Sequence, residues 1–266
     1  MNGDTMQTIL FTGARSGIQA RVIEQLKKKD YHIYLTVHNE KQLELIRQHY
    51  KEYSNITCLK MDVTEPKDLQ ILEKLDIDIL VSNAAIGEGG SMAEIPMDLI
   101  RSNFETNVFS YFTVIQIVLK KMIQKKRGKI INMASLAGLV PIPYLGSYSA
   151  TKASIIKMTE ALKLELKDLD TNVQICLIEP GLYHTGFNQV MLENKYTWMS
   201  VDSYFENQMH QIQKRENLIC KILEKKNLNG IVKLIIKAIE AKKVKPIYRA
   251  PIFQVIGAKL YLIFFE

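Results

Sequence analysis

The sequence contains little that would hold a metal ion or a disulfide framework. Its 266 residues include only three cysteines, Cys58, Cys176 and Cys220. They are odd in number, far apart and without the spacing of metal ligands, which indicates reduced thiols in a reducing compartment. We therefore expect no metal site.

Signals for export and for membrane spanning are also missing. The N-terminal segment carries Asp4 and lacks the basic-then-apolar pattern of a signal peptide. The most apolar stretch, residues 251–265, is interrupted by Gln254 and Lys259 and is shorter than the ~20 residues of a spanning helix. We expect a cytoplasmic protein without a spanning segment, in which residues 251–265 form core, a subunit interface or the cover of a pocket.

The positive charge is not arranged as in a nucleic-acid-binding surface. The chain has 35 Lys and Arg against 28 Asp and Glu, a formal net charge of +7. Many lysines lie in short runs such as 27–29 and 125–127, where helices are expected to end and cations favour the helix dipole. No stripe of interleaved aromatic and arginine residues appears. We expect no nucleic-acid partner, whereas an anionic cofactor would use this charge equally well.

Short β-branched runs alternate with amphipathic stretches along the first two-thirds of the chain. The expected strands are 8–12, 33–37, 56–61, 79–81, 129–133 and 173–178, and the expected helices are 18–29, 40–50, 66–74, 99–126 and 147–169. Because the strands are almost continuously apolar, they are typical of parallel strands covered on both faces. The pattern predicts an α/β fold: a Rossmann-like, doubly wound parallel sheet of about seven strands with helices on both faces.

The alternation fails after residue 181. Residues 185–207 give few clear signals, and helices at 208–226 and 230–242 and a short strand at 246–248 are expected to follow. No repeat or linker divides the chain, so we expect one domain over residues 1–266, with a substrate loop or lid at about 183–229.

A turn containing two glycines follows the first expected strand and reads Thr12-Gly13-Ala14-Arg15-Ser16-Gly17-Ile18. Gly13 permits a tight turn, Gly17 permits close approach of a phosphate, and the next helix directs its free N–H groups at a pyrophosphate. An ordinary strand-to-helix turn explains a glycine pair equally simply. The place of this turn, at the start of the first βαβ unit, favours nucleotide binding.

Tyr148 and Lys152 lie four positions apart in an expected helix, so their side chains share one face. A lysine beside a tyrosine favours the phenolate and moves the tyrosine pKa toward neutrality. The same spacing also fits a tyrosine packed beneath a lysine stem. The pair therefore needs support from the rest of the chain.

That support is a resemblance to the short-chain dehydrogenase/reductase family, carried by a series of motifs in that family's order and at about its spacings. They are the Thr-Gly-x-x-x-Gly turn, Asp62-Val63, Ser82-Asn83-Ala84-Ala85, Asn107, Ser135, Tyr148-x-x-x-Lys152 and Pro180-Gly181-x-x-x-Thr185. The resemblance covers residues 7–185. Two positions depart from it: Gln19 replaces the third glycine of the turn, and Ala85 replaces the glycine of an Asn-Ala-Gly motif. We expect Gln19 to crowd the helix–strand contact and Ala85 to add a methyl group near the ribose.

The resemblance implies catalytic roles for four residues. Tyr148 would donate and accept the proton, and Lys152 would bind the nicotinamide ribose and lower the tyrosine pKa. Ser135 would steady the substrate oxygen, and Asn107 would hold a water that links Lys152 to solvent. Ser135 also fits a helix cap or a solvated loop serine, and Asn107 also fits a residue that bends its helix or bonds the backbone.

The resemblance further implies a nicotinamide cofactor and the residues around it. Asp62 would accept a hydrogen bond from the adenine amine, with a strand-end cap as the alternative. The implied cofactor residues are Gly13, Arg15, Ser16, Gly17, Ile18, His38, Asn39, Asp62, Val63, Asn83, Ala84, Ala85, Tyr148, Lys152, Pro180, Gly181, Tyr183 and Thr185.

The end of the second expected strand indicates which cofactor is used. No acid stands at Val37 or His38 to accept the adenosine ribose hydroxyls, as NAD normally requires. Arg15, assisted by His38 and Asn39, would accept a 2′-phosphate because a guanidinium group matches phosphate in charge and geometry. We therefore predict NADP(H) over NAD(H). A solvated Arg15 and a surface His38 are the alternatives.

The expected substrate wall is apolar and aromatic, and includes Leu136, Pro141, Tyr144 and Phe187. These residues favour a hydrophobic substrate, although such side chains also serve as packing. We predict an NADP(H)-dependent oxidoreductase that interconverts a carbonyl and an alcohol. The alternatives are a nucleotide-binding sensor or scaffold with little catalysis, and an NAD-dependent dehydrogenase of the same fold. The family resemblance implies a homodimer or homotetramer built on the helices at 99–126 and 147–169.

Overall fold

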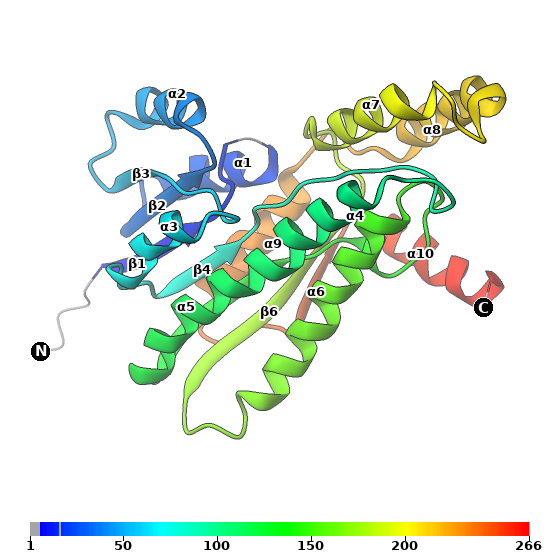
Figure 1. Ribbon diagram of the computed structural model, residues 1–266. Helices are drawn as coiled ribbons and strands as arrows, with labels where there is room; N and C mark the ends of the chain where they lie inside the picture. The colour runs from blue at the N-terminus through cyan, green and yellow to red at the C-terminus, as the bar shows by residue number, and fades with distance from the viewer. Residues whose placement is uncertain (1–5, 16, 266) are drawn as a thin grey trace, which may run out of the picture.

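Seven parallel strands form one twisted sheet in the computed structural model, which describes residues 6–15 and 17–265 (Figure 1). The strand order is β3-β2-β1-β4-β5-β6-β7. The strands are β1 (Gln7–Phe11), β2 (Tyr31–Val37), β3 (Ile56–Lys60), β4 (Ile79–Ser82), β5 (Arg127–Met133), β6 (Asn172–Pro180) and β7 (Ile247–Ala250). The predicted doubly wound parallel sheet is confirmed.

Helices cover both faces of the sheet, and each face has its own core (Figure 1). On one face lie α1 (Gly17–Leu26), α2 (Glu40–Tyr50) and α9 (Asn229–Glu240); on the other lie α3 (Pro66–Leu69), η1 (Gln70–Glu73), α5 (Ser110–Gln124) and α6 (Gly146–Glu165). Successive strand residues point to opposite faces, so Ile9 and Phe11 enter the first core and Leu10 enters the second. This explains why the strand sequences are apolar almost throughout.

The helix predicted over 99–126 is divided by a widened turn. α4 (Met97–Phe104) passes into a π-helical segment, η2 (Glu105–Phe109), before α5 begins. Asn107 lies within η2 and bonds the backbone of Ile86 with both ends of its side chain. Such π-helical turns frequently occur at functional sites.

The irregular segment expected at 185–207 is largely helical, so that prediction is wrong. α7 (Phe187–Met199) buries Met191, Lys195 and Met199, which recur every four residues on one face. The central member of this stripe is a fully buried lysine, and a lysine hides the apolar periodicity on which the prediction depended. A short η4 (Glu206–Gln208) and α8 (Met209–Leu223) follow.

The segment 251–265 forms α10 (Ile252–Phe265). Contrary to one of the three expectations, its described side chains at 252–262 do not form core, and Ile252, Phe253, Ile256 and Leu260 are exposed. Its anchor is Gln254, whose Oε1 accepts a hydrogen bond from the N–H of Leu182 at 2.6 Å and whose Nε2 donates to the carbonyl of Leu223 at 2.7 Å. Within the described part of the chain, no helix is long and apolar enough to cross a membrane.

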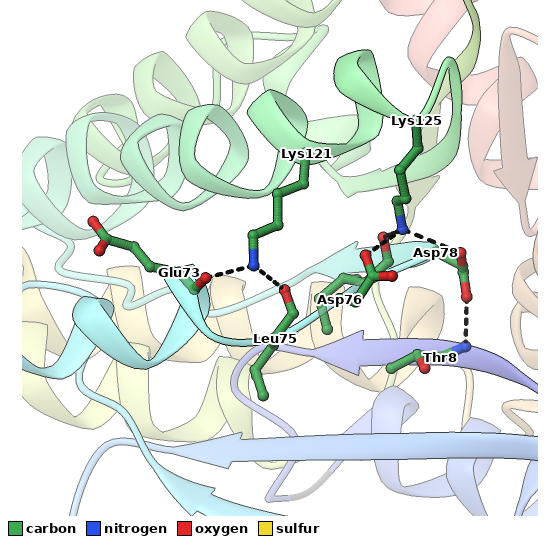
Figure 2. A network of polar contacts seen from close by, with 8 residues as sticks. Thr8, Glu73, Leu75, Asp76, Asp78, Lys121 and Lys125 are labelled. Carbon is green, nitrogen blue, oxygen red and sulfur yellow. Dashed lines mark hydrogen bonds and ion pairs between the residues drawn. The ribbon is translucent and has the colours of Figure 1, made fainter.

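Two lysines at the C-terminal end of α5 contact the segment that leads into β4 (Figure 2). The Lys121 ammonium donates to the carbonyls of Glu73 and Leu75, and Lys125 forms ion pairs with Asp76 and Asp78. Asp78 in turn accepts a hydrogen bond at 3.0 Å from the backbone N–H of Thr8, at the start of β1. These lysines are therefore bonded to the segment before β4 in addition to lying at a helix C-terminus.

Candidate active site

The turn after β1 and the end of β4 are bonded together at the point where the strand order reverses. Gly13 has a φ of +65°, and a Cβ atom there would lie 2.8 Å from the Cα of Ala84. The Thr12 hydroxyl accepts hydrogen bonds from the N–H groups of Asn83 at 2.8 Å and Ala84 at 3.1 Å. The Asn83 amide donates back to the carbonyl of Gly13 at 3.0 Å. Open α/β sheets bind their ligands at this switch point.

The loop after β6 packs against the same turn. Gly17 has a φ of +68°, and its Cβ would lie 3.2 Å from the Cβ of Thr185. Pro180 ends β6, and Gly181 donates a backbone hydrogen bond to Ala250 at 2.8 Å. Tyr183 is buried in the core beside this loop. The structure thus brings the predicted pyrophosphate turn and the predicted nicotinamide loop into contact.

Two other predicted residues lie near the turn. Ile18 is half-buried and packs against the core that contains α1, and Ala85 is half-buried after β4. Ser16 lies outside the described residues.

Gln19, the departure from the third glycine, is buried and turned toward β4. Its Nε2 donates to the Oδ1 of Asn83 at 3.2 Å, and its Oε1 is buried without a partner among the described residues. The side chain therefore fills the space that a glycine would leave and adds a hydrogen bond between α1 and the β4 end.

At the predicted adenosine end, the polar groups follow β2 and β3. Arg15 and His38 are exposed, and Asn39 caps α2 by accepting from the N–H of Gln42 at 2.9 Å. Asp62 accepts from the N–H and hydroxyl of Thr64 at 3.0 and 2.8 Å. Asn39 and Asp62 thus have local capping roles, while Arg15 and His38 present their side chains to solvent. Val63, beside Asp62, is buried in the core.

The Tyr148–Lys152 pair lies in the first two turns of α6. Both side chains are buried, with exposed fractions of 9% and 3%, and the Lys152 Nζ lies 5.6 Å from the centre of the Tyr148 ring. The same Nζ donates to the carbonyl of Met133 at 3.3 Å, at the end of β5. The helical spacing predicted from the sequence therefore brings both groups to the carboxyl edge of the sheet.

Burial governs the acid–base properties of the pair. It raises the pKa of Tyr148, although a hydrogen bond with Ser135 offsets part of this rise. Burial also lowers the pKa of Lys152 to about 8. The tyrosine pKa is therefore raised, and not lowered as was expected from Lys152, because desolvation dominates. At neutral pH the site holds a neutral phenol, which is a proton donor, near an ammonium group.

Ser135 follows β5 and combines two of its expected roles. Its Oγ accepts a hydrogen bond from the N–H of Ala137 at 3.1 Å and so caps the short η3 helix (Leu136–Gly138). Its hydroxyl lies 3.5 Å from the carbonyl of Pro180 and also bonds Tyr148. The cap fixes the hydroxyl beside the phenol.

Asn107 connects the loop after β4 to α6. Its Oδ1 accepts from the N–H of Ile86 at 2.9 Å, and its Nδ2 donates to the Ile86 carbonyl at 2.9 Å and to the Thr151 hydroxyl at 3.1 Å. Thr151 donates onward to the carbonyl of Tyr148 at 2.7 Å. Through these bonds, the Asn107 side chain positions α6 against the loop after β4.

Sequence reasoning missed the bonds that hold α6 against α4. Asn103 donates to the Ser147 hydroxyl at 2.8 Å, one helical turn before the bond between Asn107 and Thr151. The available signal was the spacing itself, because residues 103 and 107 and residues 147 and 151 are each four apart and therefore share a helix face. The sequence motif likewise contains Thr12 but does not predict its hydrogen bonds to the end of β4.

The predicted substrate residues fall into two places. The Phe187 ring lies 5.7 Å from that of Tyr148, centre to centre, and Leu136 is buried beside Ser135. Pro141 and Tyr144 instead line an open cavity of about 670 Å³. Its other apolar walls include Met92, Leu139, Val140, Ile142, Pro143 and Tyr261.

These features fit a nicotinamide dinucleotide. Two glycines with positive φ values form a turn with no room for a Cβ at Gly13, at the switch point of the sheet. Thr185 lies beside this turn, and Tyr148 and Lys152 lie at the same carboxyl edge.

Comparison with known proteins agrees with this geometry. The family model described as short chain dehydrogenase matches residues 7–195. A 3-ketodihydrosphingosine reductase of Bacteroides thetaiotaomicron is 30% identical over 239 residues, which are 83% of this chain and 85% of that protein. VdlC, a probable short-chain type dehydrogenase/reductase of Helicobacter pylori, is 33% identical over 192 residues, 70% of this chain and 68% of that protein.

Solved structures show the same fold. Actinorhodin polyketide ketoreductase with NADPH superimposes with a TM-score of 0.78 at 24% identity, covering 94% of this chain and 97% of that one. A short-chain dehydrogenase/reductase from Burkholderia phymatum in complex with NAD gives 0.80 at 19% identity, covering 98% and 94%. The chain therefore belongs to the short-chain dehydrogenase/reductase family and is an oxidoreductase that interconverts CH–OH and C=O groups with a nicotinamide cofactor.

Proposed function

We propose that the protein is an NADP(H)-dependent oxidoreductase of a hydrophobic carbonyl or alcohol, with Tyr148, Lys152 and Ser135 as its catalytic residues. The observation that carries this proposal is the buried Tyr148 phenol, hydrogen-bonded to Ser135 and near the Lys152 ammonium. Apolar neighbours, including Phe187, support the hydrophobic substrate.

In carbonyl reduction, Ser135, Tyr148 and Lys152 have separate roles. The hydroxyls of Ser135 and Tyr148 hold the substrate oxygen, where negative charge develops. When bound, the nicotinamide supplies the hydride. Tyr148 donates its proton to that oxygen, and the charged Lys152 stabilises the phenolate that remains. In oxidation the step runs in reverse, and Tyr148 takes the proton from the alcohol as the phenolate that Lys152 stabilises.

The choice of NADP(H) rests on Arg15 and on the end of β2. Arg15 and His38 are exposed, and no carboxylate occupies residues 37–39. A structural relative contains NADPH, whereas another contains NAD, so the fold itself accepts both cofactors. The exposed guanidinium group is the feature of this chain that favours the 2′-phosphate.

Replacing Arg15 with alanine is expected to weaken NADPH binding by about tenfold to a hundredfold, the range for a lost hydrogen bond to a charged group, and to leave NADH binding nearly unchanged. Fluorescence titration with both cofactors measures the two dissociation constants. Arg21→Ala provides the control, since Arg21 is an exposed arginine of α1 outside the turn. Equal losses for NADPH and NADH in R15A would remove the basis for choosing NADP(H).

The pKa of Lys152 predicts a pH dependence. Because burial lowers it to about 8, the ammonium is charged below that pH and becomes neutral above it, while the raised pKa of Tyr148 keeps the phenol protonated. We expect kcat/KM for NADPH, which reports groups of the free enzyme, to fall as the pH rises through about 8. Steady-state rates across this pH range provide the measurement. In Lys152→Arg the cation does not titrate there, so any remaining activity should lose this fall; a wild-type profile that stays flat well above pH 8 would contradict the assignment.

A panel of hydrophobic ketones and aldehydes, scored by oxidation of NADPH, tests the proposed activity. It should include 3-ketodihydrosphingosine, because a reductase of that name is a relative of this chain. Turnover by the wild-type protein supports the proposal. Tight NADPH binding without turnover across the panel would instead favour the nucleotide-binding sensor, for which Gln19 and Ala85 are the motivating departures.

A homodimer or homotetramer is part of the same proposal. The helices expected to build it expose Phe109 before α5 and Met158 and Leu164 on α6. Exposed apolar residues on neighbouring helices support a subunit interface there.

A further inference from the structure

α8 carries an exposed apolar face near its C-terminal end. This face consists of Leu218, Ile219, Ile222 and Leu223. Residues that are three or four positions apart lie on the same side of a helix, and these spacings link all four residues, so their side chains form one surface. All four are exposed, Ile222 by 67% and Leu218 by 55%. Nearer its N-terminal end, α8 packs against the molecule through the buried Met209 and Ile212.

α10 carries a second exposed apolar face that adjoins the first. Ile252, Phe253, Ile256 and Leu260 share one side of this helix and are 48–73% exposed. The hydrogen bond from Gln254 to the carbonyl of Leu223 joins the beginning of α10 to the end of α8. We call the eight residues of the two faces the α8–α10 patch. Both helices lie at the same end of the molecule, away from α2 (Figure 1).

The charges around the α8–α10 patch are almost all positive. Exposed basic residues occur within and beside it: Lys214, Arg215, Lys221, Lys225, Lys226 and Lys259. The acids of α8 and its end are Glu216, bonded by Lys195, and Glu224, bonded by His184. Residues 252–265 contain no acid at all. The patch is thus an apolar surface with a basic border.

We propose that the α8–α10 patch binds the surface of an anionic lipid bilayer. Apolar side chains that enter the acyl boundary, bordered by lysines that reach the headgroups, are the features of a helix lying in a membrane interface. The 14 residues of α10 extend over about 21 Å, less than the ~30 Å of a hydrocarbon core, so it lies on the bilayer and does not cross it.

Charge favours a bilayer over a second copy of this chain. A twofold interface would place the same surface on both sides and bring the basic borders together, and like charges across an interface are repelled. An anionic bilayer neutralises the same border. The far end of α10 at Tyr261 also lines the 670 Å³ cavity, so this cavity adjoins the proposed membrane-facing surface.

Vesicle flotation of the full chain tests the proposal. We expect flotation with vesicles of phosphatidylcholine containing about one-third phosphatidylglycerol, weaker flotation with phosphatidylcholine alone, and weakening by salt. The variant carrying both Ile222→Ser and Phe253→Ser should lose at least about tenfold in partition. Lys225→Glu with Lys226→Glu should remove the preference for anionic vesicles.

Leu45→Ser is the matched control, because Leu45 is 60% exposed on α2, far from the patch (Figure 1). It should float like the wild type. NADPH binding and circular dichroism verify that each variant is folded. No flotation of the wild type at low salt, or equal losses in L45S, would overturn the proposal. So would a serine double variant that changes the oligomeric state by sedimentation and leaves flotation unchanged, since the patch would then join copies of the chain.

Discussion

Replacing Tyr148 with phenylalanine is expected to lower kcat for carbonyl reduction by about 10²–10⁴-fold or more, the usual contribution of a positioned proton donor. The substitution removes only the hydroxyl. The ring remains available to pack against Phe187, so the fold should persist and NADPH should still bind. Single-turnover rates and a fluorescence titration of NADPH separate these two effects.

Tyr111→Phe is the matched control for this result. Tyr111 is also buried and donates its hydroxyl to the carbonyl of Ser82 at 2.6 Å, outside the catalytic group. Losing that bond should reduce the free energy of unfolding and leave kcat within about twofold, because the unpaired carbonyl costs stability and not proton transfer. If Y148F retained wild-type turnover of a confirmed substrate, Tyr148 would not be the acid.

Replacing Lys152 with methionine is expected to lower kcat/KM by about a hundredfold or more, because it removes the cation that we propose to stabilise the phenolate and to bind the ribose. The thermal stability of this variant, in contrast, should not fall. Burial lowers the pKa of Lys152 to about 8, so the folded protein disfavours the charged form at pH 7. Methionine has a similar length and no charge, and we expect the Tm at pH 7 to be unchanged or higher.

Lys195→Met is the contrasting control. Lys195 is also fully buried, but it forms an ion pair with Glu216 at 2.6 Å. Removing it leaves the Glu216 carboxylate without its cationic partner, with only the Tyr196 hydroxyl still bonded to it among the described residues. This should lower the Tm and spare the chemistry of Tyr148. A loss of activity in K152M that merely followed a loss of Tm would show a structural role for Lys152.

The sheet could be predicted from the sequence because its strands bury side chains on both faces. Ile130 and Ile131, for example, enter opposite cores, and short apolar runs of this kind are typical of covered parallel strands. α7 could not be predicted in the same way. Lys195 occupies its buried stripe, and the ion pair with Glu216, 21 residues away, makes this position tolerable.

The candidate site likewise contains parts that could be predicted from the sequence and parts that could not. Gly13 and the Tyr148–Lys152 spacing are local patterns whose geometry follows from one turn and one helix. The bonds that hold them together are not local: Thr12 bonds Ala84 across 72 residues, and Asn107 bonds Thr151 across 44. Gln254 shows most clearly what the sequence could not predict. In the sequence it only interrupts an apolar run, whereas in the fold its side chain bonds the loop after Gly181.

Transfer of deuterium from NADPH labelled on the nicotinamide C4 to a ketone substrate tests the central proposal most directly. With the best substrate of the carbonyl panel, mass spectrometry of the alcohol should show the label on the former carbonyl carbon, and Y148F should form almost none of this product. NADPH consumption without label in the alcohol, or equal labelling by Y148F, would contradict the proposed reaction at Tyr148.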